Sequence, residues 1–195
     1  MAYLDVLCSH LWLVPEEQLR CLDNEDDFPD APKIGDKSLP EAVKVVYAHL
    51  RSINEVQERL QFAAHLYTCL AVMGVIRRWV IYRIDQKKEH DVVIYDILLR
   101  MRQRRVYGCF AKTTPTLCCT CLIVPDEVRS RDFKPYFFVV WHEKPCVAIH
   151  EASEGPPPLL QNSLRRTLGS RPESFRCGVY EDLTSAHFGV LQLFP

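Results

Sequence analysis

The stretch from Leu117 to Ser153 constrains the fold of this chain more than any other. It holds three apolar runs, LCCTCLIV, FKPYFFVVW and CVAIHEAS, which are separated by a polar bend and by a short turn at Lys144-Pro145. Runs rich in β-branched and aromatic residues between turn residues are typical of β-strands. Val139-Val140-Trp141 contains no polar residue, which predicts a strand that is covered on both faces. The sequence therefore predicts a sheet at the core of the fold.

Helical patterns fill the N-terminal half of the chain. Apolar residues recur at helical spacing from Tyr3 to Val14. Ser38 and Glu41 have the spacing of a capping box, in which each side chain satisfies a free amide at the start of a helix. A second helical stripe begins near Val56, and Gly74 is its expected end because glycine adopts the left-handed conformation without steric cost.

The remaining segments mix helices and strands. Val75–Ile84 fits a strand or an extension of the preceding helix, and Leu183–Phe194 fits a helix or a strand. The other expected elements are a helix over Asp91–Arg105, a strand over Val106–Ala111, a helix over Leu159–Leu168 and a strand over Phe175–Tyr180.

These elements predict an α+β fold, with a helical N-terminal half packed on a mainly antiparallel β-sheet and one or two C-terminal helices. The chain has 195 residues, of which 48% are hydrophobic and 25% charged, as in ordinary globular domains. We expect an N-terminal helix and acidic loop over 1–37, a helical subdomain over 38–90 and an α+β sheet domain over 91–195.

Charge is distributed unevenly, although the formal net charge is only −1. Asp23–Lys37 is acidic and reads either as a docking strip or as a solvated connection. Basic residues dominate from Arg77 to Lys112, where Trp79, Tyr82 and Tyr107 are interleaved. We name the following residues the basic tract: Arg77, Arg78, Arg83, Lys87, Lys88, Arg100, Arg102, Arg104 and Arg105.

The basic tract has two interpretations. Its cations are suited to neutralise the phosphates of DNA or RNA, with aromatic residues at hand for stacking. Alternatively it is an exposed helix end and a solvated strand face that meets the acidic Asp23–Asp36 segment of the same molecule. Both interpretations are compatible with the sequence.

The nine cysteines lie mostly inside apolar runs, where cysteine behaves as a small buried hydrophobe. The first residues lack the basic start and cleavage site of a secretory signal, and no apolar run is long enough to span a membrane. We expect free thiols in a reducing compartment, nuclear or cytoplasmic, rather than a secreted disulfide framework. No membrane partner is expected.

Two groups of cysteine and histidine invite a chemical reading. Cys118-Cys119-x-Cys121 does not fit zinc, because adjacent strand residues point to opposite faces and a second ligand pair is missing. A nucleophile pair of Cys146 with a histidine (His142 or His150) is the one enzymatic alternative, without any flanking signature. With 7 glycines the chain contains no phosphate-binding fingerprint. We therefore expect no enzyme, catalytic residue, metal, cofactor or small-molecule substrate.

The order of features from about Cys118 to Phe194 resembles the central domain of the centromere protein N family, a kinetochore component. Three stretches carry the resemblance: Lys134-Pro135 before the aromatic-Val139-Val140 strand, Pro158-Leu159-Leu160 with Leu164, and Asp182-Leu183 with Ser185, Val190 and Phe194. That family contacts the centromeric nucleosome. The resemblance thus implies a nuclear adaptor at the centromere of the chromosome.

Three hypotheses for function follow. In the first, the chain is a non-enzymatic adaptor of centromere protein N type that binds DNA, a nucleosome or an acidic partner through the basic tract. In the second, it is a protein–protein interaction subunit of a larger complex with no nucleic-acid role. In the third, it is a Cys/His-dependent enzyme.

Overall fold

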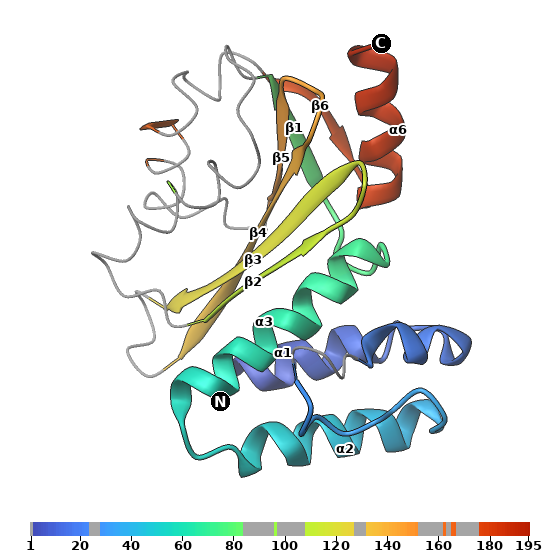
Figure 1. The fold of residues 1–195 in the computed structure, drawn as a ribbon, viewed down its shortest axis with the longest axis vertical. Helices are drawn as coiled ribbons and strands as arrows, with labels where there is room; N and C mark the ends of the chain where they lie inside the picture. Colours follow the sequence, from blue (N-terminus) through green and yellow to red (C-terminus); the bar gives the residue numbers. More distant parts are fainter. Residues whose placement is uncertain are drawn as a thin grey trace.

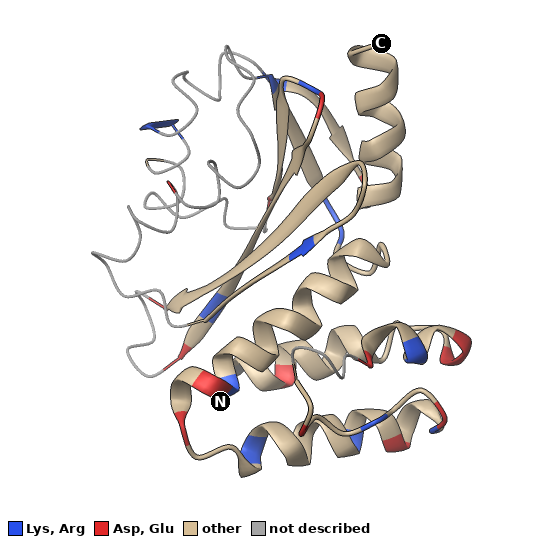
Figure 2. Cartoon of the chain, in the orientation of Figure 1, with Lys and Arg blue, Asp and Glu red and all other residues tan. Residues whose placement is uncertain are grey.

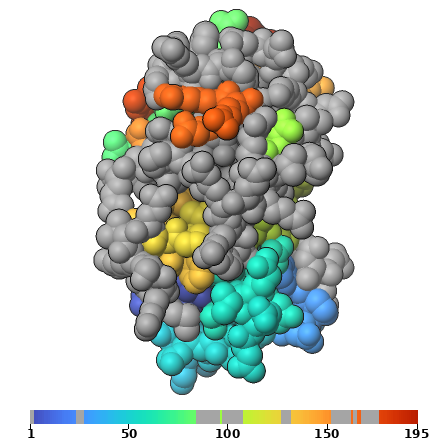
Figure 3. All heavy atoms as spheres, turned by 90° about the vertical axis from the view of Figure 1, so that its left-hand side faces the viewer, coloured from blue at the N-terminus to red at the C-terminus, as the bar shows by residue number. Residues whose placement is uncertain are grey.

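The structure of the chain is a computed structural model, and it describes residues 2–23, 28–83, 96, 108–126, 132–151, 162, 165–166 and 176–195. It confirms the α+β class, with described helices towards both ends of the chain and an antiparallel sheet between them. The N-terminal helices gather at one end of the sheet and α6 lies beside β6 at the other (Figure 1). A view turned by 90° also places the N-terminal helices at the lower end of the molecule (Figure 3).

The N-terminal helices form where the sequence predicts them. Glu41 accepts hydrogen bonds from the Ser38 amide at 3.3 Å and from its hydroxyl at 2.9 Å, as the capping-box pattern indicates. Gly74 follows the third helix with φ 77°, in the left-handed region. The described elements are α1 (Ala2–Leu11), the 3-10 helix η1 (Glu16–Leu22), α2 (Leu39–Ser52) and α3 (Val56–Val72).

Six antiparallel strands are ordered β2-β3-β4-β5-β1-β6 across the sheet. They are β1 (Trp79–Arg83), β2 (Gly108–Thr113), β3 (Leu117–Pro125), β4 (Phe133–Trp141), β5 (Cys146–His150) and β6 (Arg176–Tyr180). Both open alternatives are thereby decided, because Val75–Ile84 contains strand β1 and Leu183–Phe194 contains helix α6 (Leu183–Leu193). The helices predicted over Asp91–Arg105 and Leu159–Leu168 lie outside the described residues, except for Asp96, Asn162, Arg165 and Arg166, which are helical.

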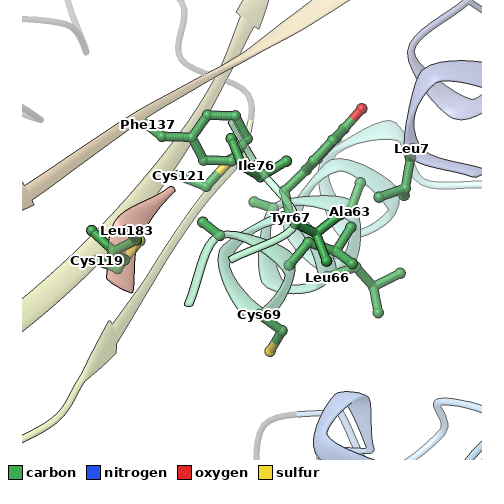
Figure 4. Packing of buried hydrophobic residues seen from close by; sticks show 14 of the residues in the cluster. Leu7, Ala63, Leu66, Tyr67, Cys69, Ile76, Cys119, Cys121, Phe137 and Leu183 are labelled. Atoms are coloured by element: carbon green, nitrogen blue, oxygen red, sulfur yellow. The ribbon is translucent and has the colours of Figure 1, made fainter. Parts of the chain in front are cut away.

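Strand β3 and the second half of β4 are buried on both faces, as the sequence predicts for Val139-Val140-Trp141. Cys119 and Phe137 point into a cluster shared with α3, where the ring of Tyr67 lies 5.7 Å from that of Phe137 (Figure 4). Cys118 and Phe138 lie on the opposite face by the alternation of strand side chains, and both are fully buried as well. Each large apolar side chain removed from water in this way contributes about 1.5–3 kcal/mol.

A polar network fastens α1 to this core. The Tyr3 amide donates to Asp132 Oδ1 at 3.3 Å, and Tyr67 Oη donates to the Tyr3 carbonyl at 3.1 Å. Arg59 Nε donates to Tyr3 Oη at 3.0 Å. Tyr3 thereby joins α1 to α3 and to the start of β4.

The predicted division into 1–37, 38–90 and 91–195 remains a prediction. The described helices and the sheet share one cluster of buried apolar side chains, which extends in sequence from Tyr3 to Val190. Residues on the two sides of each predicted domain boundary therefore pack against one another in this cluster.

Helix α3 seals the β2 edge of the sheet. Gln61 Oε1 accepts from the Cys109 amide at 3.3 Å, and Thr68 Oγ1 donates to the Phe110 carbonyl at 3.3 Å. Such contacts cover an edge that would otherwise invite pairing with another strand. The approach is close because residue 108 is glycine: a Cβ there would lie 2.5 Å from the Leu60 carbonyl oxygen.

We predict that Gly108→Ala lowers the free energy of unfolding by about 1–3 kcal/mol, because the added methyl meets backbone rather than a movable side chain. The opposite sign is the usual expectation for removing glycine from a strand. Urea unfolding followed by circular dichroism measures the change. Ala111→Ser, at an exposed position of the same strand, is the control, and equal stability of the two variants would contradict the close contact.

Candidate interaction surface

The structure describes three residues of the basic tract, Arg77, Arg78 and Arg83. The first two precede β1 and the third ends it. The other six lie outside the described residues: Lys87, Lys88, Arg100, Arg102, Arg104 and Arg105. Whether those six bind a partner therefore stays a prediction.

Carboxylates of the same chain balance two of the described arginines. Arg77 Nη1 lies 3.1 Å from Asp182 Oδ2 and 3.7 Å from Glu181 Oε1. Arg78 Nε lies 3.7 Å from Glu151 Oε2, which is also 3.8 Å from Arg176 Nη2. The arginines of these pairs are about half exposed, so the pairs contribute little stability, yet they offset the charge of Arg77 and Arg78.

The acidic partners differ from those suggested by the sequence. In one of the two interpretations the tract meets Asp23–Asp36, but the described residues Arg77 and Arg78 pair with carboxylates that follow β5 and β6. Asp23 instead accepts from the amides of Ile34 and Gly35, and Asp36 pairs with Arg20. These local bonds favour the interpretation of the segment as a structured connection.

Asp182 links this charge cluster to helix α6. Its carboxylate accepts from the Ser185 amide at 2.7 Å, as the residue that caps the helix. This hydrogen bond is the main reason that the pKa of Asp182 is lowered, and Arg77 adds to the shift. Arg77 therefore helps to keep the capping carboxylate of Asp182 ionised at the start of α6.

Arg78 has an unusual backbone, with φ 74° in a region that non-glycine residues rarely occupy. Its amide donates to the Glu181 carbonyl at 2.6 Å, and its carbonyl accepts from the Glu151 amide at 3.0 Å. These two bonds hold the ends of β5 and β6 together through residue 78. The bonds thus require a conformation that costs a side-chain-bearing residue about 1–2 kcal/mol.

Replacing Arg78 separates the backbone effect from the ion pair. We predict that Arg78→Gly is more stable than Arg78→Ala by about 1 kcal/mol, because both lose the guanidinium and only glycine is unstrained at positive φ. Thermal unfolding of the two variants under one buffer measures the difference. If alanine proved equal to glycine, the left-handed conformation of residue 78 would be refuted.

Cys146 and the thiols of β3 are poorly suited to nucleophilic chemistry. Cys146 is buried, and this burial raises the pKa of its thiol to about 12. Burial likewise raises the pKa of Cys119 and of Cys121. Because the thiolate is the reactive form, these cysteines resemble packed core residues.

His150, one of the two histidines considered as a partner of Cys146, packs among aromatic rings. His150 packs its ring against Phe137 at 5.3 Å and Trp79 at 6.0 Å between centroids. Within the described part of the chain, no three histidine, cysteine or carboxylate residues are grouped so as to hold a metal ion. These observations weigh against the Cys/His enzyme hypothesis.

Burial of His150 predicts a pH dependence. Burial lowers the pKa of His150 to about 4, from 6.5, and His10 adds to the shift. The unfolded chain therefore takes up a proton on this ring at a higher pH than the folded chain does. We predict that about 3 kcal/mol of stability is lost as pH falls from about 6.5 to about 4. Urea unfolding across this range should show a shallower pH slope for His150→Phe; an unchanged slope would contradict the assignment.

Helix α6 exposes an apolar surface that the sequence analysis did not identify. Phe188 is 61% exposed and Leu191, one turn further on, is 46% exposed; we name these two the α6 face. The inner side of the helix is buried through Leu183, Ala186, Gly189 and Val190. The sequence does contain one indication of this surface, because residues 183–195 include no Asp, Glu, Lys or Arg.

The helix is fixed firmly enough to present this face. Trp141 Nε1 donates to His187 Nδ1 at 2.9 Å, which ties α6 to the end of β4. The ring of Tyr180 occupies the space beside Gly189, where a Cβ would lie 2.3 Å from its hydroxyl. The α6 face is therefore the outer side of a docked helix.

No protein-family model matches the sequence, and no curated protein matches it. None of the helices in the described ranges combines the length and the apolar character needed to cross a membrane. The function of this chain must therefore be inferred from its own surfaces.

Proposed function

We propose that the chain is a non-enzymatic adaptor that binds another protein subunit through the α6 face. The observation that carries the proposal is an exposed, well-anchored helix with large apolar side chains and no charge. Nucleic-acid contact draws its affinity from cations, which this helix lacks. A protein surface of apolar, uncharged character is the partner that fits it.

The resemblance of residues 118–194 to the centromere protein N family supports a setting for this adaptor. We propose a nuclear, kinetochore-like assembly in which the chain is one of several subunits. The buried sheet would then be a rigid platform, and its peripheral helices would make the contacts.

Binding of DNA or a nucleosome through the basic tract is the competing proposal. Arg83 supports it, because this residue is exposed at the end of β1 and begins the more basic part of the tract. Arg77 and Arg78 support it less, since Asp182 and Glu151 balance their charge.

Co-purification from nuclease-treated extracts of the source cells tests the adaptor proposal. We predict that a stoichiometric protein partner is recovered with the wild-type chain and is reduced at least tenfold by Phe188→Ser with Leu191→Ser, since buried apolar anchors dominate interfaces. The control is Thr184→Ala with Gln192→Ala, at exposed polar positions of the same helix. Unfolding temperatures verify that both variants fold.

Retention of the partner by the Phe188/Leu191 variant would refute the α6 contact. A second arm measures duplex-DNA binding of the purified chain against salt concentration. Tight, salt-sensitive binding that Arg83→Glu weakens would favour the basic-tract proposal instead. A wild-type chain that pairs only with itself would identify the partner as a second copy.

A further inference from the structure

Helix α1 packs one side in the core, and apolar side chains are exposed on its outer side and in the turn that follows it. Tyr3, Leu7 and Leu11 are buried, as a single amphipathic stripe requires. On the outer side Val6 is 43% exposed and Trp12 50% exposed.

These outer residues lie along the end of α1 and the turn that follows it. The Trp12 amide donates to the Cys8 carbonyl at 3.1 Å, and the Leu13 amide donates to the His10 carbonyl at 3.0 Å, so both residues are held at the end of the helix. Leu13 is 64% exposed. We name Val6, Trp12 and Leu13 the Trp12 face.

Carboxylates flank the Trp12 face at both ends. Asp5 precedes Val6, and Glu16 and Glu17 follow Leu13 at the start of η1; all three are exposed. The nearest basic residue in the sequence, Arg20, is already paired with Asp36. Acidic positions lie along the end of the layer that contains α1 and η1, together with the basic position of Arg20 (Figure 2).

We propose that the Trp12 face binds an amphipathic segment of a partner protein in which lysines or arginines border an apolar stripe. An exposed tryptophan among aliphatic residues is the usual anchor of such contacts, and the acidic rim selects a basic partner by charge complementarity. The same rim repels nucleic acid and anionic membranes. The three side chains offer roughly 250 Å² of apolar surface, which suits a short segment better than a globular partner that needs about 800 Å².

This contact is independent of the α6 face, because the two surfaces lie on different helices. It gives the adaptor a second site of different chemistry: an uncharged surface at α6 and an acid-rimmed surface at α1. One chain with both sites is able to bridge two partners.

Fluorescence offers a direct readout, because the chain has three tryptophans and only Trp12 is exposed. The probe is an 18-residue synthetic peptide of leucine and lysine at helical spacing. We expect the emission to shift to the blue and acrylamide quenching to decrease when this peptide binds the wild-type chain. Binding should weaken as salt is added.

Variants identify the contact by anisotropy of a labelled peptide. Asp5→Lys with Glu17→Lys, and separately Trp12→Ser with Leu13→Ser, should each weaken binding at least tenfold, while Phe188→Ser with Leu191→Ser leaves it unchanged. Glu16 is kept because it also accepts from the Leu39 amide. Unfolding temperatures show whether each variant is folded.

Three results would overturn the inference: equal binding of a leucine–glutamate peptide, equal binding of a lysine–serine peptide, or wild-type affinity in the Trp12/Leu13 variant. The Trp12 face would then bind an acidic or uncharged partner, or it would bind no partner. None of these results bears on the α6 contact, which its own variant tests.

Discussion

Burial of β3 and β4 on both faces is the constraint on which the rest of the structure depends. Cys119 and Phe137 pack against α3, while Cys118 and Phe138 are equally inaccessible on the reverse side. Strands with two dry faces tolerate few polar side chains, because an unpaired buried polar group costs about 1–3 kcal/mol. The core therefore takes up the cysteines of β3 and the most apolar runs of the chain, together with the large side chains of Trp79, Trp141 and Phe137.

Function is consequently left to the periphery. The groups that normally perform chemistry, such as Cys146 and His150, are packed in the interior with pKa values that keep them neutral near pH 7. The helices at the two ends of the chain retain apolar residues that packing does not use. This division supports the proposed adaptor, which has a rigid centre and two different contact surfaces.

Local patterns made most of the fold predictable. The run Val139-Val140-Trp141 indicated a doubly covered strand, and Ser38 with Glu41 marked the start of α2. Leu183–Phe194 stayed ambiguous because Leu183, Val190 and Leu193 satisfy a strand as well as a helix at short range. The cap at Asp182 and the bond from Trp141 to His187 decide for the helix, and the second depends on tertiary contact.

The contact surfaces were harder to predict for a physical reason. Arg77 finds its carboxylate 105 positions later in the sequence, so the charge balance of the tract depends on how β1 and β6 pair. Trp12 and Phe188 look like core residues in a linear sequence, and only the side on which their helices pack leaves them exposed. A pattern shows which residues are apolar but not which of them find partners inside the chain.

Alkylation of neighbouring cysteines tests the doubly buried sheet most directly. The native chain is treated briefly with iodoacetamide and each thiol is quantified by mass spectrometry, with exposed Cys21 as the reactive reference. The account predicts that Cys118 and Cys119, which point to opposite faces, both stay unmodified until the protein is denatured. Modification of Cys118 at the rate of Cys21 would show that one face of the sheet is open to solvent and would contradict the account.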